Sequence, residues 1–135
     1  MGARVASLAV GLLISLAAPG AGPAISPEDL AGLLQHDVPL VVDVRTPAEF
    51  RDGHMAGAIN IPHDEIAGRW PALNVAAEDE VIIYCGTGRR AGLAQQALET
   101  LGYMHTRVLD GGFEAWKKAG LPVVKESVNA TSGHD

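Results

Sequence analysis

Short runs of apolar, β-branched residues recur along the chain and predict strands. Residues 40–44 (LVVDV) and 81–84 (VIIY) are almost entirely apolar, which is typical of strands that are covered on both faces. Shorter runs of the same kind occupy residues 58–61, which Pro62 ends, and residues 106–109. The sequence therefore predicts a sheet whose strands lie inside the protein.

Segments with helical features separate these strands. In residues 26–35, Ser26 is a suitable N-cap, Pro27 suits the first helical position, and three leucines fall on one face. The other predicted helices cover residues 46–53, 63–73, 91–101 and 113–119. We expect the second of these to break around Trp70 and Pro71. Because helices alternate with strands, the sequence predicts an α/β fold with a largely parallel sheet.

Residues 1–24 have the pattern of a secretory signal peptide. Arg4 supplies a positive charge, residues 5–18 form an uncharged apolar run, and small residues follow up to Ala24. A membrane-spanning helix needs roughly 20 apolar residues, so this shorter run favours a cleaved signal over an uncleaved anchor. We therefore expect a periplasmic or secreted protein that begins at Ile25 and has no stable membrane association after cleavage.

The rest of the chain fits one domain. The full sequence has 135 residues, of which 47% are hydrophobic, and this suffices for one packed core. We expect that domain over residues 25–124, followed by a polar C-terminal tail over residues 125–135. The net charge is −6 and no cluster of Lys and Arg is longer than a pair, so the sequence lacks the basic surface of a nucleic-acid-binding protein.

The only cysteine, Cys85, is the candidate for chemistry. Exported proteins commonly use cysteines in disulfide pairs, whereas a lone thiol is either buried and inert or kept for its reactivity. Cys85 directly follows the strand predicted at residues 81–84, and its loop, CGTGRR, leads into a predicted helix. Parallel sheets bind ligands at the carboxyl ends of their strands, so we expect the functional crevice there.

The loop after Cys85 favours a thiolate. Its backbone N–H groups can form an anion-binding nest, the next helix adds the positive end of its dipole, and Arg89 and Arg90 add full charges. We expect Gly86 and Gly88 to supply backbone conformations that other residues resist. A buried, inert cysteine at a strand end is the alternative, but the glycines and arginines favour a reactive thiol.

Three blocks of the sequence resemble the rhodanese family. Residues 41–62 (VVDVRTPAEFRDGHMAGAINIP) are similar to its first signature, and residues 85–90 are similar to its active-site loop. Residues 111–116 (GGFEAW) are similar to its closing segment, and the whole resemblance spans residues 26–122. The resemblance implies a five-stranded, mostly parallel sheet that is flanked by helices on both faces.

The resemblance also implies an activity, that of a thiosulfate sulfurtransferase. Cys85 would attack the outer sulfur of thiosulfate, release sulfite and hold a persulfide until cyanide or a thiol takes the sulfur. The implied substrate-binding residues are Gly86, Thr87, Gly88, Arg89 and Arg90. No metal and no organic cofactor is expected. Three alternatives stay open: mercaptopyruvate as the donor, a persulfide relay or regulatory binding module with little turnover, and a thiol redox sensor.

The length of the loop separates two branches of this fold. In the related phosphatases and arsenate reductases, five residues separate the cysteine from an arginine, and that loop wraps a phosphate-like anion. Here four residues separate Cys85 from Arg90, and the next position is Ala91. This spacing resembles that of the sulfurtransferases, so phosphatase activity is the weaker interpretation.

Four charged or titratable residues of the first signature receive structural interpretations. We expect an ion pair between Arg45 and Glu49 that fastens the loop after the first strand, with Asp43 near the floor of the site. His54 matches a family histidine that is structural in character. We therefore assign none of the four a catalytic role.

Overall fold

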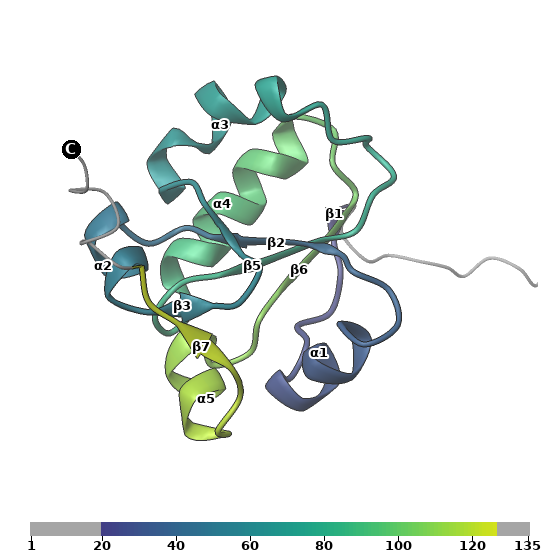
Figure 1. Ribbon diagram of the computed structural model, residues 1–135. Coiled ribbons are helices and arrows are strands. Elements are labelled where there is room, and N and C mark those ends of the chain that lie inside the picture. The colour runs from purple at the N-terminus through teal and green to yellow at the C-terminus, as the bar shows by residue number, and fades with distance from the viewer. Residues whose placement is uncertain (1–19, 127–135) are drawn as a thin grey trace, which may run out of the picture.

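A parallel sheet of five strands forms the centre of the protein (Figure 1). The computed structural model describes residues 20–126. The strand order is β1-β6-β5-β2-β4, and every neighbouring pair is parallel. The strands are β1 (Gly20–Ala21), β2 (Leu40–Asp43), β4 (Ile59–Asn60), β5 (Val81–Tyr84) and β6 (His105–Val108). This sheet confirms the fold class that the sequence predicts.

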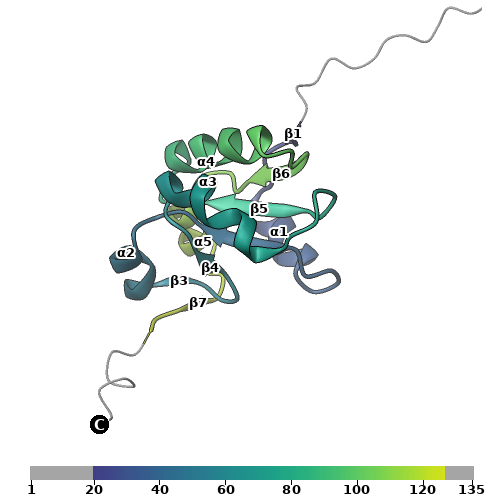
Figure 2. The ribbon, with the colours of Figure 1, turned by 90° about the horizontal axis from the view of Figure 1, so that it is seen from above.

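Helices cover both faces of the sheet, as Figure 2 shows. One face carries α1 (Pro27–Leu33) and α5 (Gly112–Lys118), and the other carries α3 (Ile66–Arg69) and α4 (Arg89–Thr100). Within residues 20–126, no helix is long and apolar enough to cross a membrane.

Shorter helical segments complete the chain. α2 (Pro47–Asp52) follows the carboxyl end of β2. Two turns of 3₁₀ helix, η2 (His63–Glu65) and η3 (Trp70–Leu73), flank α3. The helix predicted over residues 63–73 is therefore broken at Trp70, as expected, and also before Ile66.

β5 is buried on both faces because its side chains alternate between the two helical layers. All four side chains are completely shielded from solvent. Val81 and Ile83 pack with α3 and α4, whereas Ile82 and Tyr84 pack with Phe113 of α5. The central strand β5 therefore ends between the two helical layers, and Cys85 follows it at that point.

Two predicted helix starts are confirmed by their caps. The Ser26 hydroxyl accepts a hydrogen bond of 3.0 Å from the Asp29 N–H at the start of α1. At the start of α2, the Thr46 hydroxyl accepts from the Glu49 N–H, and the Glu49 carboxylate accepts from the Thr46 N–H at 3.0 Å. This reciprocal capping box fixes the position of Glu49, which also faces the candidate site.

Three strands were not predicted from the sequence: β1, β3 (His54–Met55) and β7 (Val123–Val124). Each has two residues, which is too short to show an alternating pattern. β3 and β7 form a separate antiparallel pair, and β1 pairs with β6 at the edge of the main sheet. β1 falls within the predicted signal peptide, whose residues 1–19 lie outside the described residues. The signal peptide and the polar tail over residues 125–135 stay predictions.

Candidate active site

Cys85 lies at the carboxyl end of the central strand, immediately after β5, and is only 2% exposed. Its sulfur accepts hydrogen bonds from the Gly88 N–H at 3.1 Å and from the Ala91 N–H at 3.4 Å. Gly88 is the N-cap of α4, and Ala91 lies in its first turn. The sulfur therefore sits at the positive end of a helix of 12 residues, where a negative charge is stabilised.

The loop predicted to bind substrate lies around this sulfur, but its two glycines have different backbone conformations. Gly88 has φ +142°, which favours glycine, as the sequence analysis expected. Gly86 has no such conformation, and a Cβ there would meet Arg90 at an ordinary 3.7 Å. The expectation that Gly86 is required for its backbone conformation is therefore wrong, because the tight part of the loop lies at Gly88.

The start of α5 holds the backbone of the loop. The Phe113 N–H donates to the Cys85 carbonyl at 2.8 Å, and the Glu114 N–H donates to the Gly86 carbonyl at 3.1 Å. Gly112 allows this approach: its φ is +64°, and a Cβ there would lie 2.7 Å from the Cys85 carbonyl oxygen. Since such a contact is sterically forbidden, only glycine fits at this position.

The two arginines of the loop have different surroundings. The Arg90 guanidinium donates to both carboxylate oxygens of Glu49, at 2.8 Å and 3.2 Å. Hydrogen bonding from Arg90, more than that from Thr46, lowers the pKa of Glu49 from 4.5 to about 2. Arg89 is exposed and forms no ion pair among residues 20–126. Arg90 thus fastens the loop to α2, while Arg89 keeps an available charge.

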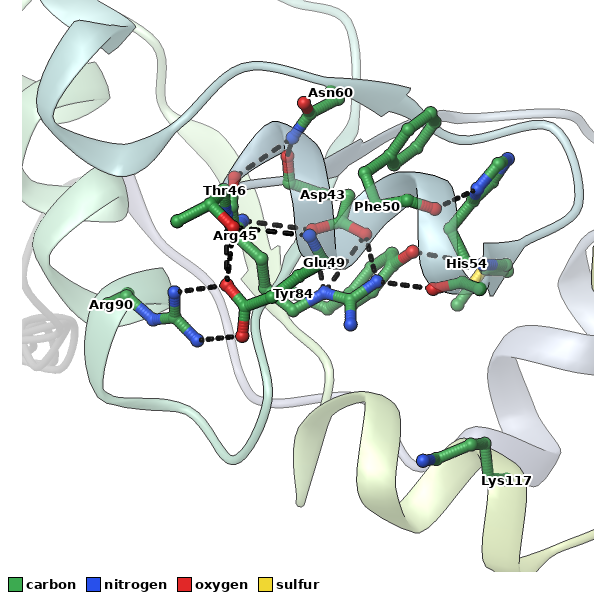
Figure 3. A network of polar contacts seen from close by, with 12 residues as sticks. Asp43, Arg45, Thr46, Glu49, Phe50, His54, Asn60, Tyr84, Arg90 and Lys117 are labelled. Carbon is green, nitrogen blue, oxygen red and sulfur yellow. Dashed lines mark hydrogen bonds and ion pairs between the residues drawn. The ribbon is translucent and has the colours of Figure 1, made fainter. Parts of the chain in front are cut away.

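The expected ion pair between Arg45 and Glu49 is wrong (Figure 3). Arg45 instead donates to the buried Asp43 carboxylate, with Nη2 at 2.7 Å from Oδ2, and to the Gly53 carbonyl at 2.7 Å. Burial lowers the pKa of Arg45, but the hydrogen bonds and charge of Asp43 outweigh burial and raise it. Asp43 is completely buried and needs this partner, so it competes successfully for Arg45, and Glu49 is free to bind Arg90.

A pocket of about 280 Å³ opens beside the loop, between α2 and α5. It is lined by charged groups from both helices and by an aromatic ring: Arg45, Glu49, Asp52, Gly53, Phe113, Glu114, Lys117 and Val123. Figure 3 shows Glu49 and Arg45 on one side and Lys117, on α5, on the other. Three of these lining residues also bind the loop: Glu49 pairs with Arg90, and the N–H groups of Phe113 and Glu114 donate to the carbonyls of Cys85 and Gly86.

His54 has structural contacts in the folded protein. Its Nδ1 lies 2.7 Å from the Phe50 carbonyl oxygen, and its ring stacks on Phe50 with centroids 3.5 Å apart. In the part of the chain that the structure describes, no three His, Cys, Asp or Glu residues gather as a metal site. These contacts agree with the structural interpretation of His54.

Sequence reasoning missed the partners that surround the loop. Ala91 was noted only for the spacing of the loop, yet its N–H is one of the two donors to the sulfur. Glu49 was assigned to the wrong arginine, and Gly112 and Phe113 were noted as part of a family block and at the start of a predicted helix, without their contacts to the loop. The adjacent glycines before a helix could have signalled a close backbone approach, but nothing local identifies which backbone they meet.

Comparisons with known proteins identify the family. Residues 26–119 match the family model described as a rhodanese-like domain. Thiosulfate sulfurtransferase PspE of Escherichia coli (strain K12) is 36% identical over 84 residues, which are 62% of this chain and 77% of that protein. The uncharacterized protein slr1261 of Synechocystis is 38% identical over 102 residues, which are 75% of this chain but only 55% of that longer protein.

A solved structure has the same architecture. The crystal structure of a rhodanese-related protein from Thermoplasma volcanium superposes with a TM-score of 0.68 at 30% sequence identity. The match covers 78% of this chain and 100% of that chain.

Substitution of Gly112 by alanine is expected to damage the site more than the fold. The positive φ costs about 1–2 kcal/mol, and the clash with the loop carbonyls displaces the Cys85 sulfur from its donors. A displacement of this kind lowers sulfur transfer about 10- to 100-fold, measured as kcat/KM. Gly120→Ala is the matched control, because Gly120 has φ +74° at the other end of α5 but open space around its Cβ position. Equal losses of transfer in both variants would contradict this role of Gly112.

The ion pair between Glu49 and Arg90 is expected to stabilise the protein only while Glu49 is ionised. Its folded pKa of about 2 lies below the ordinary 4.5, so this stability is present above pH 4.5 and is lost as the pH falls toward 2. Because the Glu49 side chain is 42% exposed, the contribution is below about 1 kcal/mol. The measurement is the free energy of unfolding of wild type and Glu49→Gln, which keeps the capping box, across this pH range.

The difference between these two proteins should shrink as the pH falls. Glu78→Gln is the control for removal of a carboxylate, because Glu78 forms no ion pair among residues 20–126. A difference between wild type and Glu49→Gln that does not depend on pH would show that the charge of Glu49 has no such effect.

Proposed function

Because the chain belongs to the rhodanese-like domain family, we propose that it is a thiosulfate sulfurtransferase that works through a persulfide on Cys85. The observation that carries this proposal is the setting of the sulfur, which accepts hydrogen bonds from the N–H groups of Gly88 and Ala91. Preorganised donors of this kind stabilise a negative charge on sulfur. They favour both the thiolate that attacks and the persulfide anion that results.

The first half-reaction is a nucleophilic substitution at sulfur. The Cys85 thiolate attacks the outer sulfur of thiosulfate and forms a new S–S bond. The S–S bond of thiosulfate breaks, and its electron pair leaves with sulfite. Total charge and electrons balance, so the step needs neither a proton nor an external electron.

The second half-reaction returns the free thiolate. A cyanide ion or a thiolate attacks the outer sulfur of the Cys85 persulfide and takes it as thiocyanate or as a new persulfide. Cys85 leaves with the electron pair of the bond that breaks. The fixed backbone of the loop suits this cycle, because the same N–H groups serve the attacking and the departing sulfur.

Arg89 is the donor-binding side chain in this mechanism. It is the exposed first residue of α4 and forms no ion pair among residues 20–126, so its charge is available to attract the thiosulfate dianion. Arg90 is paired with Glu49 and keeps the end of the loop in place. The remaining predicted substrate-binding residues, Gly86, Thr87 and Gly88, contribute backbone rather than charge.

The proposed location is the periplasm or another extracytoplasmic space. The pattern of residues 1–24, a charged start followed by a short apolar run and small residues, supports this proposal. Fractionation of cells that express the full chain tests it: recovery of the processed protein outside the cytoplasm is expected, and unprocessed protein in the cytoplasm would contradict it.

Replacement of Cys85 by serine is expected to abolish persulfide formation and leave the fold intact. Serine nearly preserves the size of the side chain but removes the nucleophilic sulfur. Intact mass spectrometry of the wild type after incubation with thiosulfate should show the gain of one sulfur atom, which cyanide then removes. Cys85→Ser should show no gain.

Two outcomes would change the assignment. A wild type that gains no sulfur from thiosulfate, although Cys85 is reduced, would exclude thiosulfate as the donor, and mercaptopyruvate would be tested next. A wild type that gains sulfur but turns over slowly with every small acceptor would favour a persulfide relay over an enzyme.

Substitution of Arg89 by alanine is expected to weaken the use of thiosulfate specifically. The kcat/KM for thiosulfate should fall about 10-fold, at the lower end of electrostatic steering, and its dependence on salt should become weaker. The kcat/KM for an uncharged persulfide donor should fall much less. Arg69→Ala is the control, because Arg69 lies on α3 and pairs with Glu65. Equal losses with both donors would contradict the role of charge.

A further inference from the structure

The chain enters the sheet at β1, before the point where the sequence predicts the end of the signal peptide. Ala21 of β1 is the partner of Thr106 in β6, and the two strands are parallel (Figure 2). The next residue, Gly22, donates its N–H to the Thr106 carbonyl at 2.9 Å. The Arg107 Nε donates to the Pro23 carbonyl at 2.9 Å. This segment therefore covers the side of β6 that faces away from β5.

Gly22 lies in close contact with β6. A Cβ at this position would lie 3.0 Å from the Thr106 carbonyl oxygen and 3.1 Å from the Arg107 side chain. Thr106 itself is completely buried. The segment before Ile25 is therefore packed as a strand of the sheet, and a larger side chain at Gly22 would push it away from β6.

Ile25 would be the first residue of the exported protein if the signal were cut after Ala24. It is only 2% exposed, and its N–H donates to the Val108 carbonyl at 3.0 Å. A cut at this bond turns the N–H into an ammonium group, which is mostly charged at neutral pH because the ordinary pKa of a chain end is about 8. Burial of a charge whose N–H groups lack enough acceptors is costly. The sheet therefore disfavours a chain end at Ile25.

The position of Ile25 also affects the support of the active-site loop. Its carbonyl accepts a hydrogen bond of 2.8 Å from the Asp110 N–H. Asp110 directly precedes Gly111, which is the N-cap of α5, and the start of α5 holds the carbonyl of Cys85. A charged chain end at Ile25 would thus disturb the turn that leads into α5.

The sequence contains a cleavage site that keeps β1 whole. Signal peptidases cut after a small residue that has another small residue two positions before it. Ser15 and Ala17 meet this requirement at the end of the apolar run, with Leu16 between them. Later bonds with the same pattern, such as the one after Ala24, would divide or remove the segment that is bound to β6.

We propose that signal peptidase cuts the bond between Ala17 and Ala18, and that residues 20–24 remain in the exported protein as part of its sheet. This inference rests on the proposed export and is independent of the persulfide cycle. The step is a hydrolysis, in which water adds across the peptide bond and leaves a carboxylate on Ala17 and an ammonium group on Ala18. The new charge is then placed ahead of β1 in the chain and not at a buried residue of the sheet.

The test determines the N-terminus of the processed protein. The full chain is expressed in a bacterial host, and the protein recovered outside the cytoplasm is analysed by intact mass and by N-terminal sequencing. The expected first residue is Ala18. A first residue after Gly20, Ile25 included, would overturn the retention of β1, and any other first residue before Gly20 would overturn the choice of bond.

Two alanine variants distinguish the competing bonds. Ala17→Leu places a large side chain next to the proposed bond, so processing should be lost and the uncut chain should accumulate. Ala24→Leu is the matched control, because it makes the same change at the competing bond and Ala24 is exposed in the folded protein. It should be processed as wild type is. The reverse pattern would overturn the inference.

The variant Gly22→Val tests whether the segment is present and bound after processing. Its side chain would collide with β6, so the melting temperature of the processed protein should fall by about 4 °C, whereas Ala24→Leu should melt as wild type does. A cut after Ala24 would remove residue 22, and the processed variant would then be identical to wild type. An unchanged melting temperature of Gly22→Val would therefore overturn the inference.

The outcomes separate this inference from the proposed enzyme activity. A chain that is never processed would overturn the inference together with the proposed export, and sulfur transfer by Cys85 would still stand. A protein that begins at Ala18 but takes up no sulfur would overturn the proposed activity and leave the cleavage site standing.

Discussion

The close approach of α5 to the active-site loop is the constraint on which the site depends. At Gly112 the backbone of one helix comes so near the carbonyls of Cys85 and Gly86 that no side chain fits between them. Two hydrogen bonds from the start of α5 then fix the loop from that side. As a result, the N–H groups of the loop stay aimed at the Cys85 sulfur before any substrate arrives, which is the preorganisation that catalysis requires.

Ion pairs determine which charged side chains around that loop remain available. Asp43 is buried and pairs with Arg45, so Glu49 is available to pair with Arg90. With Arg90 engaged, Arg89 is the arginine of the loop that can meet an anionic donor. The proposed cycle therefore relies on backbone N–H groups at the sulfur and on the exposed charge of Arg89. The ion pairs position the loop and do not touch the reacting atoms.

Much of this arrangement could be predicted from the sequence, for identifiable physical reasons. The long apolar runs of β2 and β5 and the caps Ser26 and Thr46 are local signals, and they located the main elements and the loop after Cys85. The choice of partner for Arg45 is not local, because it depends on which carboxylate is buried by the packing of the sheet. The same holds for Gly112, whose partner lies 26 residues earlier in the chain, and for two-residue strands such as β1, which have no periodicity.

A crystal structure of the protein after reaction with thiosulfate tests the persulfide on Cys85 directly. One additional sulfur atom is expected on Cys85, with the N–H groups of Gly88 and Ala91 still directed at the persulfide. The hydrogen bond from Phe113 to the Cys85 carbonyl should be intact. A sulfur atom bonded elsewhere, or a persulfide that points away from these N–H groups with the loop released from α5, would contradict the proposed cycle.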